Sequence, residues 1–331
     1  MSTTQTSISW TDVTWNALRG CSRVSTGCEH CYAESQAGRF SGSGQPYEGL
    51  VRKTSQGWKW TGDIKLITKD LELPLHWKKP RRIFVNSMSD LFHENVPDIW
   101  LLAIFDVIRQ CPQHTFQILT KRAKRQQDFC ARLRWDNFYN AKQPRHLPIE
   151  YRTQDGGGVL WLADSHDGPG YPLMGCHRYT GMHWVWLGVS VENQDTADER
   201  IPWLLNTPAA VRFISYEPAL GPVDFTKVWC TDGDRLGPYL HNLGMDTGLD
   251  WVICGGESGS KARPCDLEWL QSCISQCSAA GIACFVKQIG SHPEVWNKDH
   301  TVMYQPKLYD RKGADPSEWP NDLQVQQFPG V

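Results

Sequence analysis

The chain has 331 residues, of which 40% are hydrophobic and 21% charged, a composition that excludes a disordered chain and supplies a sizeable core. Its 34 basic and 36 acidic residues give a formal net charge of −2, so any contact with nucleic acid must be local. The polar start lacks the order of a signal peptide, and no apolar run reaches the roughly 18 residues of a membrane span. We therefore expect a cytoplasmic protein without membrane contact, whose 12 cysteines stay reduced.

The first distinctive feature is a cysteine array, Cys21-x6-Cys28-x2-Cys31, which precedes the strong helix and strand signals. A Cys-x-x-Cys pair lets two thiolates reach one metal centre, and a third thiolate from the preceding loop gives three soft ligands. Structural zinc takes four protein ligands, for which His30 and Cys176-His177 are only loose candidates. The array therefore favours a [4Fe–4S] cluster with one open corner over zinc.

Short β-rich runs that end in polar residues or glycine predict buried parallel strands. They cover Arg82–Val85, Thr115–Leu119, His183–Val189, Val211–Ser215, Trp251–Cys254 and Ala283–Val286. Helical patterns lie between them, over Ile99–Arg109, Ala197–Leu205 and Leu267–Ala279. Successive strands often start about 30 residues apart, which is the length of a βαβ unit. The sequence therefore predicts an α/β fold, and a partial (β/α) barrel is the first choice.

The predicted domain organisation is a single barrel domain over residues 1–290, followed by a C-terminal extension over 291–331. Two stretches interrupt the alternation of strands and helices, at about 134–180 and 226–248, and both are rich in glycine and aspartate. We interpret these stretches as insertions between barrel elements.

Polar residues directly after the apolar runs are the next site candidates, because functional side chains of a barrel project from the C-terminal ends of its strands. These candidates are Ser87, Ser89, Asp90, Ser190, Glu192, Asn193, Glu217, Gly255, Gly256, Glu257 and Lys287. The glycines permit a close approach of backbone to a ligand. The structural alternatives are a helix cap at Ser89 and Asp90, a solvated loop after Val189, and an ion pair from Glu217 to Arg212 or Lys287.

The chain resembles a phage-associated, three-cysteine-motif family of uncharacterised proteins that look related to radical S-adenosylmethionine enzymes. The resemblance covers most of the chain. Besides the cysteine array and the following Tyr32-Ala33-Glu34, it rests on the segments 84–92 (FVNSMSDLF), 119–122 (LTKR), 187–193 (LGVSVEN), 215–222 (SYEPALGP), 255–259 (GGESG) and 285–288 (FVKQ).

The resemblance implies a radical S-adenosylmethionine type of barrel and its cofactors. Cys21, Cys28 and Cys31 would each bind one iron of a [4Fe–4S] cluster, and S-adenosylmethionine would chelate the fourth iron. The first gap of six residues departs from the usual C-x3-C-x2-C spacing. The segment with Ser87, Ser89 and Asp90 would hold the methionyl amino group, and the segment with Ser190, Glu192 and Asn193 would bind the adenosyl moiety. The segment with Gly255, Gly256 and Glu257 would line a cofactor or substrate loop.

Glu217 and Lys287 are the candidate catalytic residues. The phage association implies a nucleotide or a modified base of phage DNA as substrate, with a reductant such as flavodoxin or ferredoxin and a further partner protein as expected partners. Two basic runs, Lys78–Arg82 and Lys121–Arg125, offer local contacts for a nucleic-acid backbone. The alternative hypothesis is a zinc-stabilised nucleic-acid-binding protein without catalysis. The remaining cysteines, among them Cys254, Cys273, Cys277 and Cys284, are interpreted as core residues.

Overall fold

The computed structural model describes residues 6–137, 150–155, 158–163, 171–172, 174, 181–226, 248–297, 299, 301 and 303–330. The chain divides into two compact units. Unit 1 comprises Met1–Val24, Cys31–Leu187 and Thr207–Ala210, and unit 2 comprises Ser25–His30, Gly188–Asn206 and Val211–Val331. One boundary falls inside strand β12 (Val185–Val191), and two others fall inside the cysteine array.

Unit 1 contains parallel strands that form from short apolar runs. They are β1 (Val13–Trp15), β6 (Arg82–Val85) and β7 (Thr115–Thr120), and the pairs β1–β6 and β6–β7 are parallel. Helix α3 (Asp98–Arg109) connects β6 to β7 in the chain, starts after Pro97 and buries an almost continuous apolar run. Helix α4 (Ala123–Arg132) follows β7. The crossover helix between parallel strands is the expected βαβ connection.

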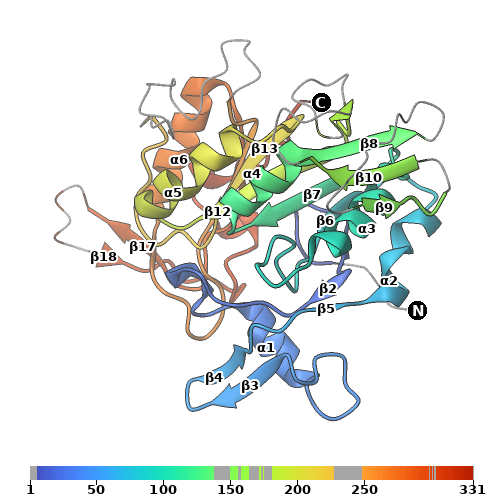
Figure 1. Cartoon of the computed structure of the whole chain (residues 1–331). Coiled ribbons are helices and arrows are strands. Elements are labelled where there is room, and N and C mark those ends of the chain that lie inside the picture. Colours follow the sequence, from blue (N-terminus) through green and yellow to red (C-terminus); the bar gives the residue numbers. More distant parts are fainter. Residues whose placement is uncertain are drawn as a thin grey trace. The chain divides into compact units, whose positions relative to one another are not determined.

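Smaller elements complete unit 1. They are β2 (Leu18–Arg19), α1 (Tyr32–Arg39), β3 (Val51–Thr54), β4 (Gly57–Trp60), β5 (Lys65–Leu66), α2 (Thr68–Leu71), η2 (Leu73–His76), β8 (Leu133–Asn137), β9 (Glu150–Arg152), β10 (Gly158–Leu162) and β11 (Tyr171–Pro172). The β3–β4 hairpin lies beside α1 (Figure 1). Strands β8 to β11 form an antiparallel sheet in the order β11-β8-β10-β9, within the stretch predicted to be an insertion at about 134–180.

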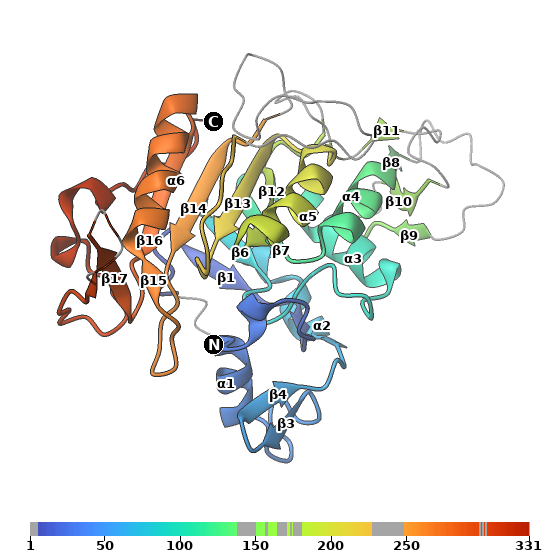
Figure 2. The ribbon, with the colours of Figure 1, turned by 90° about the vertical axis from the view of Figure 1, so that its left-hand side faces the viewer.

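Unit 2 contains a second set of parallel strands. They are β13 (Val211–Tyr216), β14 (Trp251–Gly255) and β16 (Ala283–Gln288), paired in that order (Figure 2). Its other elements are η1 (Thr26–Cys28), α5 (Gln194–Leu205), β15 (Cys265–Asp266), α6 (Leu267–Ala280), β17 (Pro293–Trp296), β18 (Met303–Tyr304), η3 (Pro316–Glu318) and η4 (Asn321–Leu323). Helix α6 begins at its N-cap Asp266 and ends at Gly281, whose φ of 68° is the left-handed conformation that glycine favours.

The strand order is sequential, which places the protein in the mixed α/β class with a seven-stranded parallel sheet. The order is β1-β6-β7-β12-β13-β14-β16, so each strand comes later in the chain than the one before it. All six predicted strands and all three predicted helices are confirmed, with ends that differ by up to three residues. Strand β1 was not predicted, because it is only three residues long and polar residues flank it on both sides.

Three further predictions concern the C-terminal extension, the second insertion and membrane-spanning segments. The predicted C-terminal extension 291–331 lies in unit 2, where Gln327 and Val325 form backbone hydrogen bonds with Cys284 and Val286 of β16. Most of the predicted insertion 226–248 lies outside the described residues, as do Cys176, His177 and Cys230. Among the helices that the structure describes, none has the length and apolar character needed to cross a membrane.

Candidate functional site

The three cysteines of the array differ from the other described cysteines in exposure. Cys21, Cys28 and Cys31 are half-buried. The other cysteines within the described ranges are all buried: Cys111, Cys130, Cys254, Cys265, Cys273, Cys277 and Cys284. A half-buried thiol is accessible to a metal or cluster from solvent. The array therefore stays a candidate metal centre.

The array lies in the connection that leaves β1, at the C-terminal end of the first strand of the sheet. Cys21 follows β2, and Cys31 is the N-cap residue of α1. Both thiols belong to unit 1, where they pack with Met88 against a small apolar cluster. That cluster consists of Ala33, Ala37, Tyr47, Leu50, Val51 and Trp60. Cys28 belongs to unit 2, where it ends the 3-10 helix η1.

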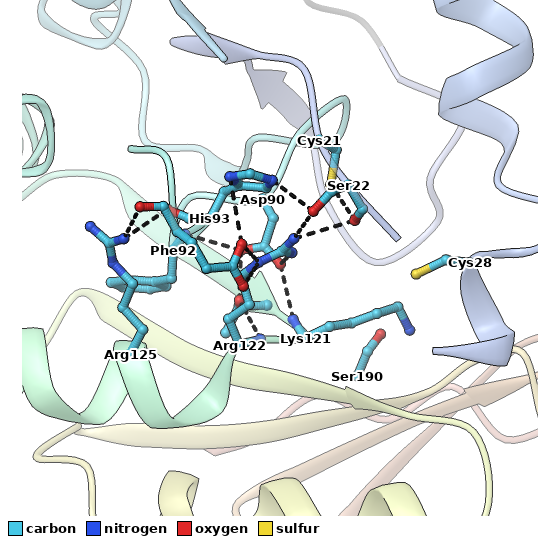
Figure 3. Close-up of polar contacts among 12 residues, drawn as sticks. Cys21, Ser22, Cys28, Asp90, Phe92, His93, Lys121, Arg122, Arg125 and Ser190 are labelled. Carbon is cyan, nitrogen blue, oxygen red and sulfur yellow. Dashed lines mark hydrogen bonds and ion pairs between the residues drawn. The ribbon is translucent and has the colours of Figure 1, made fainter. Parts of the chain in front are cut away.

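In unit 1, a buried carboxylate organises the residues beside Cys21. Asp90 is 7% exposed and follows the β6 strand end. One of its oxygens accepts hydrogen bonds from the Phe92 N–H at 3.0 Å and the Thr120 hydroxyl at 2.6 Å. The other accepts from the Lys121 N–H at 3.1 Å and from Arg122 Nη1 at 2.9 Å (Figure 3). These four donors use the lone-pair positions that a carboxylate normally offers.

Arg122 connects this carboxylate to the cysteine loop. Its Nη2 donates to the Ser22 hydroxyl at 2.8 Å, and its Nε donates to the Glu94 carboxylate at 2.8 Å. Burial lowers the pKa of the Arg122 guanidinium, but attraction to Asp90 and Cys21 raises it more, so Arg122 stays a fixed cation. A permanent positive charge beside Cys21 favours the thiolate form that a metal requires.

His93 supports the same loop through the Ser22 hydroxyl. The backbone N–H of Asn95 donates to His93 Nδ1 at 3.0 Å, so the neutral ring carries its proton on Nε2. Nε2 then donates to the Ser22 hydroxyl at 2.8 Å (Figure 3). Burial lowers the pKa of His93, and the nearby Arg122 cation lowers it further. The folded protein therefore favours a neutral imidazole here.

This neutral histidine predicts a pH-dependent stability. Below the ordinary histidine pKa of 6.5, the unfolded chain takes up a proton at His93 that the folded chain resists, so the free energy of unfolding should fall as pH decreases. One such group gives a slope of at most about 1.4 kcal/mol per pH unit. His93→Gln should reduce the loss in urea unfolding between about pH 7 and 5.5. The exposed His76→Gln is the control, and an equal slope in wild type and His93→Gln would contradict the prediction.

The predicted residues Ser87 and Ser89 pack against the loop that leaves β1. The Ser87 hydroxyl donates to the Asn16 side chain at 3.2 Å, and the Ser89 hydroxyl donates to the Leu18 carbonyl at 3.1 Å. Both serines are half-buried. Asn86 precedes them with a φ of 59°, an uncommon value for a residue other than glycine. This segment is thus a shaped turn at the end of β6 and not the start of a helix.

In unit 2, Glu192 holds the part of the array that contains Cys28. Glu192 follows β12 and is fully buried. Its carboxylate accepts a hydrogen bond from the Ser25 hydroxyl at 2.9 Å and pairs with Arg200 at 3.2 Å. A Cβ atom on Gly27 would lie 2.4 Å from Glu192 Oε1, so this position requires glycine. The predicted cofactor ligand Glu192 therefore supports the cysteine loop directly.

Glu257 supports the same loop from the end of β14. Its carboxylate accepts from the Arg263 side chain at 2.8 Å and lies 3.0 Å from His30 Nδ1. Arg263 in turn donates to the Thr26 carbonyl at 2.9 Å and pairs with Glu29 at 3.3 Å. Burial raises the pKa of Glu257, but the hydrogen bonds from Arg263 and His30 lower it more. Glu257 is therefore an anion that fixes residues 26–30.

The candidate catalytic residues Glu217 and Lys287 form an ion pair. Lys287 Nζ lies 2.9 Å from Glu217 Oε1, which confirms one of the two structural alternatives for Glu217. The two residues come from the ends of β13 and β16, and Gly255 of β14 lies between these strands. A Cβ on Gly255 would lie 2.7 Å from the Gln288 carbonyl oxygen and 3.2 Å from Glu217 Oε1. Gly255 thus leaves room for the pair.

Three more predicted residues take structural places. Asn193 caps α5, because its side chain accepts from the Thr196 N–H at 3.1 Å. The Ser190 carbonyl accepts from Arg200 at 2.8 Å, and Ser190 is buried. A Cβ on Gly256 would lie 2.5 Å from the Ile289 carbonyl oxygen, so its glycine permits close packing of neighbouring chain segments. None of these contacts tests a role in cofactor binding.

Comparison with known proteins places the chain in a family. Residues 5–316 match the family model described as "Protein of unknown function (DUF5131)". The chain belongs to this family. No curated protein and no solved structure matches it.

In this family member, sequence reasoning missed the residues that join the predicted acids to the cysteine loop. The sequence places Arg122 in a basic run that predicts contacts with phosphate or carboxylate groups, with a solvated charge as the alternative, yet the residue is 8% exposed. Arg200 and Arg263 belong to no recognisable motif. Ser22 and Ser25 lie between the cysteines of the array, where only the cysteines were considered as site residues. An arginine near an acid in sequence, such as Arg263 six residues after Glu257, was the available signal.

Proposed function

We propose that this protein is a radical S-adenosylmethionine-type enzyme whose cysteine array binds a [4Fe–4S] cluster. The observation that carries the proposal is the array itself, because its three thiols are half-buried while the other described cysteines are buried. Three soft ligands suit a cluster that keeps one iron free of protein ligands. Such a cluster, together with S-adenosylmethionine, supplies a 5′-deoxyadenosyl radical that abstracts a hydrogen atom from substrate.

The topology supports the same proposal. The sequential strand order is the order of a partial (β/α) barrel, in which catalytic groups occupy the C-terminal ends of the strands. The cysteine array leaves the end of β1, the first strand in that order. Asp90, Glu192, Glu217 and Glu257 follow the ends of later strands. In this proposal the strand ends carry both the metal centre and the groups that position it.

The chain's own residues have clear tasks in this proposal. Arg122 places a cation beside Cys21 and holds Ser22, which fixes the backbone next to the first thiol. Glu192 holds Ser25 and leaves room only for glycine at position 27, directly before Cys28. Glu257 holds His30, directly before Cys31. Each thiol therefore has a neighbouring residue tied to a buried charged group.

Anaerobic reconstitution tests the proposal. The protein would be purified without oxygen and supplied with iron and sulfide, and iron, acid-labile sulfide and zinc would be measured. We expect about four irons and four sulfides per chain at the array. After addition of dithionite and S-adenosylmethionine, chromatography should detect 5′-deoxyadenosine. Zinc at the array without iron or sulfide would instead support the zinc-stabilised nucleic-acid-binding protein.

The turn after β6 yields a prediction for S-adenosylmethionine binding. Because Asp90 already accepts four hydrogen bonds, we propose that Ser87 meets the methionyl group and Asp90 positions the turn. Ser87→Ala should weaken binding by about 1 kcal/mol, the worth of one neutral hydrogen bond, which calorimetry measures as roughly a fivefold higher Kd. If Asp90→Asn weakens binding without changing the urea midpoint, Asp90 contacts the ammonium directly and Ser87 does not carry this role.

We infer that the substrate is a nucleotide or a base of phage DNA, with Glu217 and Lys287 as the catalytic pair. A lysine paired with a glutamate at the ends of the two strands that flank β14 can meet a phosphate or an amide while staying charge-balanced. A flavodoxin or ferredoxin would supply the electron that reduces the cluster. A further partner protein is also part of the proposal. The basic runs contribute less than the sequence suggests, because Arg122 and Arg125 donate to groups inside unit 1.

The remaining basic run predicts salt-dependent binding of DNA. Lys79 is exposed, and Arg81 lies over the Trp77 ring at 5.6 Å, so both are near the surface of the 78–82 segment. Reversing the charge of Lys79 and Arg81 should lower the slope of log binding constant against log salt by roughly one to two units. Fluorescence titrations with duplex and single-stranded DNA measure this slope. Lys312→Glu, another exposed lysine, is the control, and no binding at low salt would favour a small nucleotide substrate.

A further inference from the structure

A second group of cysteines converges inside unit 2, away from the array in sequence. The sulfur atoms of Cys254, Cys273 and Cys284 all lie within 4.8 Å of one another. Cys277 joins them through hydrogen-bonding contacts with Cys273 and Cys284. All four residues are at least 98% buried. This group could not be predicted from spacing, because its members are spread over 31 positions without a Cys-x-x-Cys pair.

The fold explains why these four thiols meet. Cys273 and Cys277 are four residues apart on α6, so they lie on the same face of that helix. In the parallel pair β14–β16, Cys284 is opposite Val252, and Cys254 is two residues further along β14. Two residues is the side-chain period of a strand, so Cys254 and Cys284 lie on the same face of the sheet. Helix α6 packs against both strands (Figure 2).

The spacing of the sulfurs distinguishes among metal centres. Four thiolates at Zn–S distances of about 2.3 Å form a tetrahedron whose edges measure about 3.8 Å. The sulfurs of Cys254, Cys273 and Cys284 lie within 4.8 Å of one another and need only small movements to take three corners of that tetrahedron. Cys277, which contacts Cys273 and Cys284, would supply the fourth corner. A [4Fe–4S] cluster binds its thiolates at separate corners of a cube and needs them farther apart. The group is therefore sized for a single ion.

We propose that Cys254, Cys273, Cys277 and Cys284 bind one Zn²⁺ in a closed structural site. Four soft ligands with no open position are the donor set of structural zinc. On binding, each thiol loses its proton to solvent and forms one Zn–S bond, so no oxidant or reductant is needed. This site rests on different residues from the proposed radical chemistry and stands if that chemistry fails.

The ion would tie α6 to β14 and β16, and β16 carries the catalytic candidate Lys287. Cys254 directly precedes Gly255, and Cys284 is three residues before Lys287. These ties would steady the strand end that leads to Glu257 and the strand that carries Lys287, the partner of Glu217. The zinc site would therefore stabilise unit 2 without contacting substrate.

Metal analysis of the whole chain tests this inference. The protein would be expressed with zinc in the medium, purified under reducing conditions and analysed by plasma mass spectrometry. We expect one tightly held zinc in wild type, also in the triple variant Cys21→Ala, Cys28→Ala, Cys31→Ala, which cannot bind a metal at the array. Cys273→Ala with Cys277→Ala should lose that zinc and keep the iron of the array.

The control is Cys265→Ala, a buried cysteine of the same unit whose pKa burial raises to about 12, and it should keep the zinc. Because a double alanine variant can fail to fold, wild type would also be supplied with Co²⁺. Visible bands of tetrahedral cobalt and intense thiolate-to-cobalt absorption are expected in the triple variant. Absence of both zinc and this cobalt spectrum from a folded triple variant would overturn the inference, as would a disulfide among the four cysteines. A wild-type protein that holds this zinc but binds no iron at the array would overturn the proposed function and leave the zinc site in place.

Discussion

Replacing Cys28 by alanine is expected to abolish cluster binding and the formation of 5′-deoxyadenosine. Removing one of three thiolates leaves two ligands for a four-iron cluster, which is too few to hold it. The visible charge-transfer absorption after anaerobic reconstitution should therefore fall to background, and so should cleavage of S-adenosylmethionine. The fold should persist, because Cys28 is half-buried at the end of the short 3-10 helix η1.

The matched control for this variant is Cys111→Ala. Cys111 is a buried cysteine outside both cysteine groups, and burial raises the pKa of its thiol to about 11. Its variant should retain iron, sulfide and activity. A Cys28→Ala protein with the iron and sulfide content of wild type would show that the array is not the cluster site.

Arg122→Met is expected to lower the free energy of unfolding by roughly 3–5 kcal/mol, the usual effect of leaving one partner of a buried ion pair uncompensated. The variant removes the cation from Asp90, which keeps its burial and its three neutral donors. It also removes the hydrogen bond to Ser22 beside Cys21. Urea unfolding followed by tryptophan fluorescence measures the change.

Glu94→Gln separates this buried pair from the surface part of the same network. Glu94 also pairs with Arg122, but its side chain is 61% exposed, so its loss should change stability by less than about 1 kcal/mol. If Arg122→Met and Glu94→Gln destabilise the protein equally, the charge pair with Asp90 is not the source of the effect.

The parallel strands were predictable because each is a short, almost wholly apolar run. All residues of β12 and β13, for example, are buried. Helix α4 was not predicted, because its sequence is mostly polar and only four of its residues are buried. The sequence alone does not indicate which residues of α4 are buried, because this depends on how the helix packs in the folded protein.

The site was predictable in part. Spacing alone identified the cysteine array, and strand ends identified Asp90, Glu192 and Glu257. Their partners were not predictable, since Ser25 and Glu192 are 167 residues apart and meet only through the fold. The group around Cys254 and Cys284 was missed for the same reason, because its geometry depends on strand register and on the face that α6 presents.

The contacts of residues 25–30 mean that this part of the array is preorganised. Ser25 is anchored to Glu192, His30 to Glu257 and the Thr26 carbonyl to Arg263, and none of these contacts involves a thiol. Ordering a backbone residue costs about 1–2 kcal/mol, and here folding bears that cost. Metal loading should consequently proceed with little change in helix or strand content and with rapid kinetics. The loop thus resembles a rigid receptor more than a segment that folds around its ion.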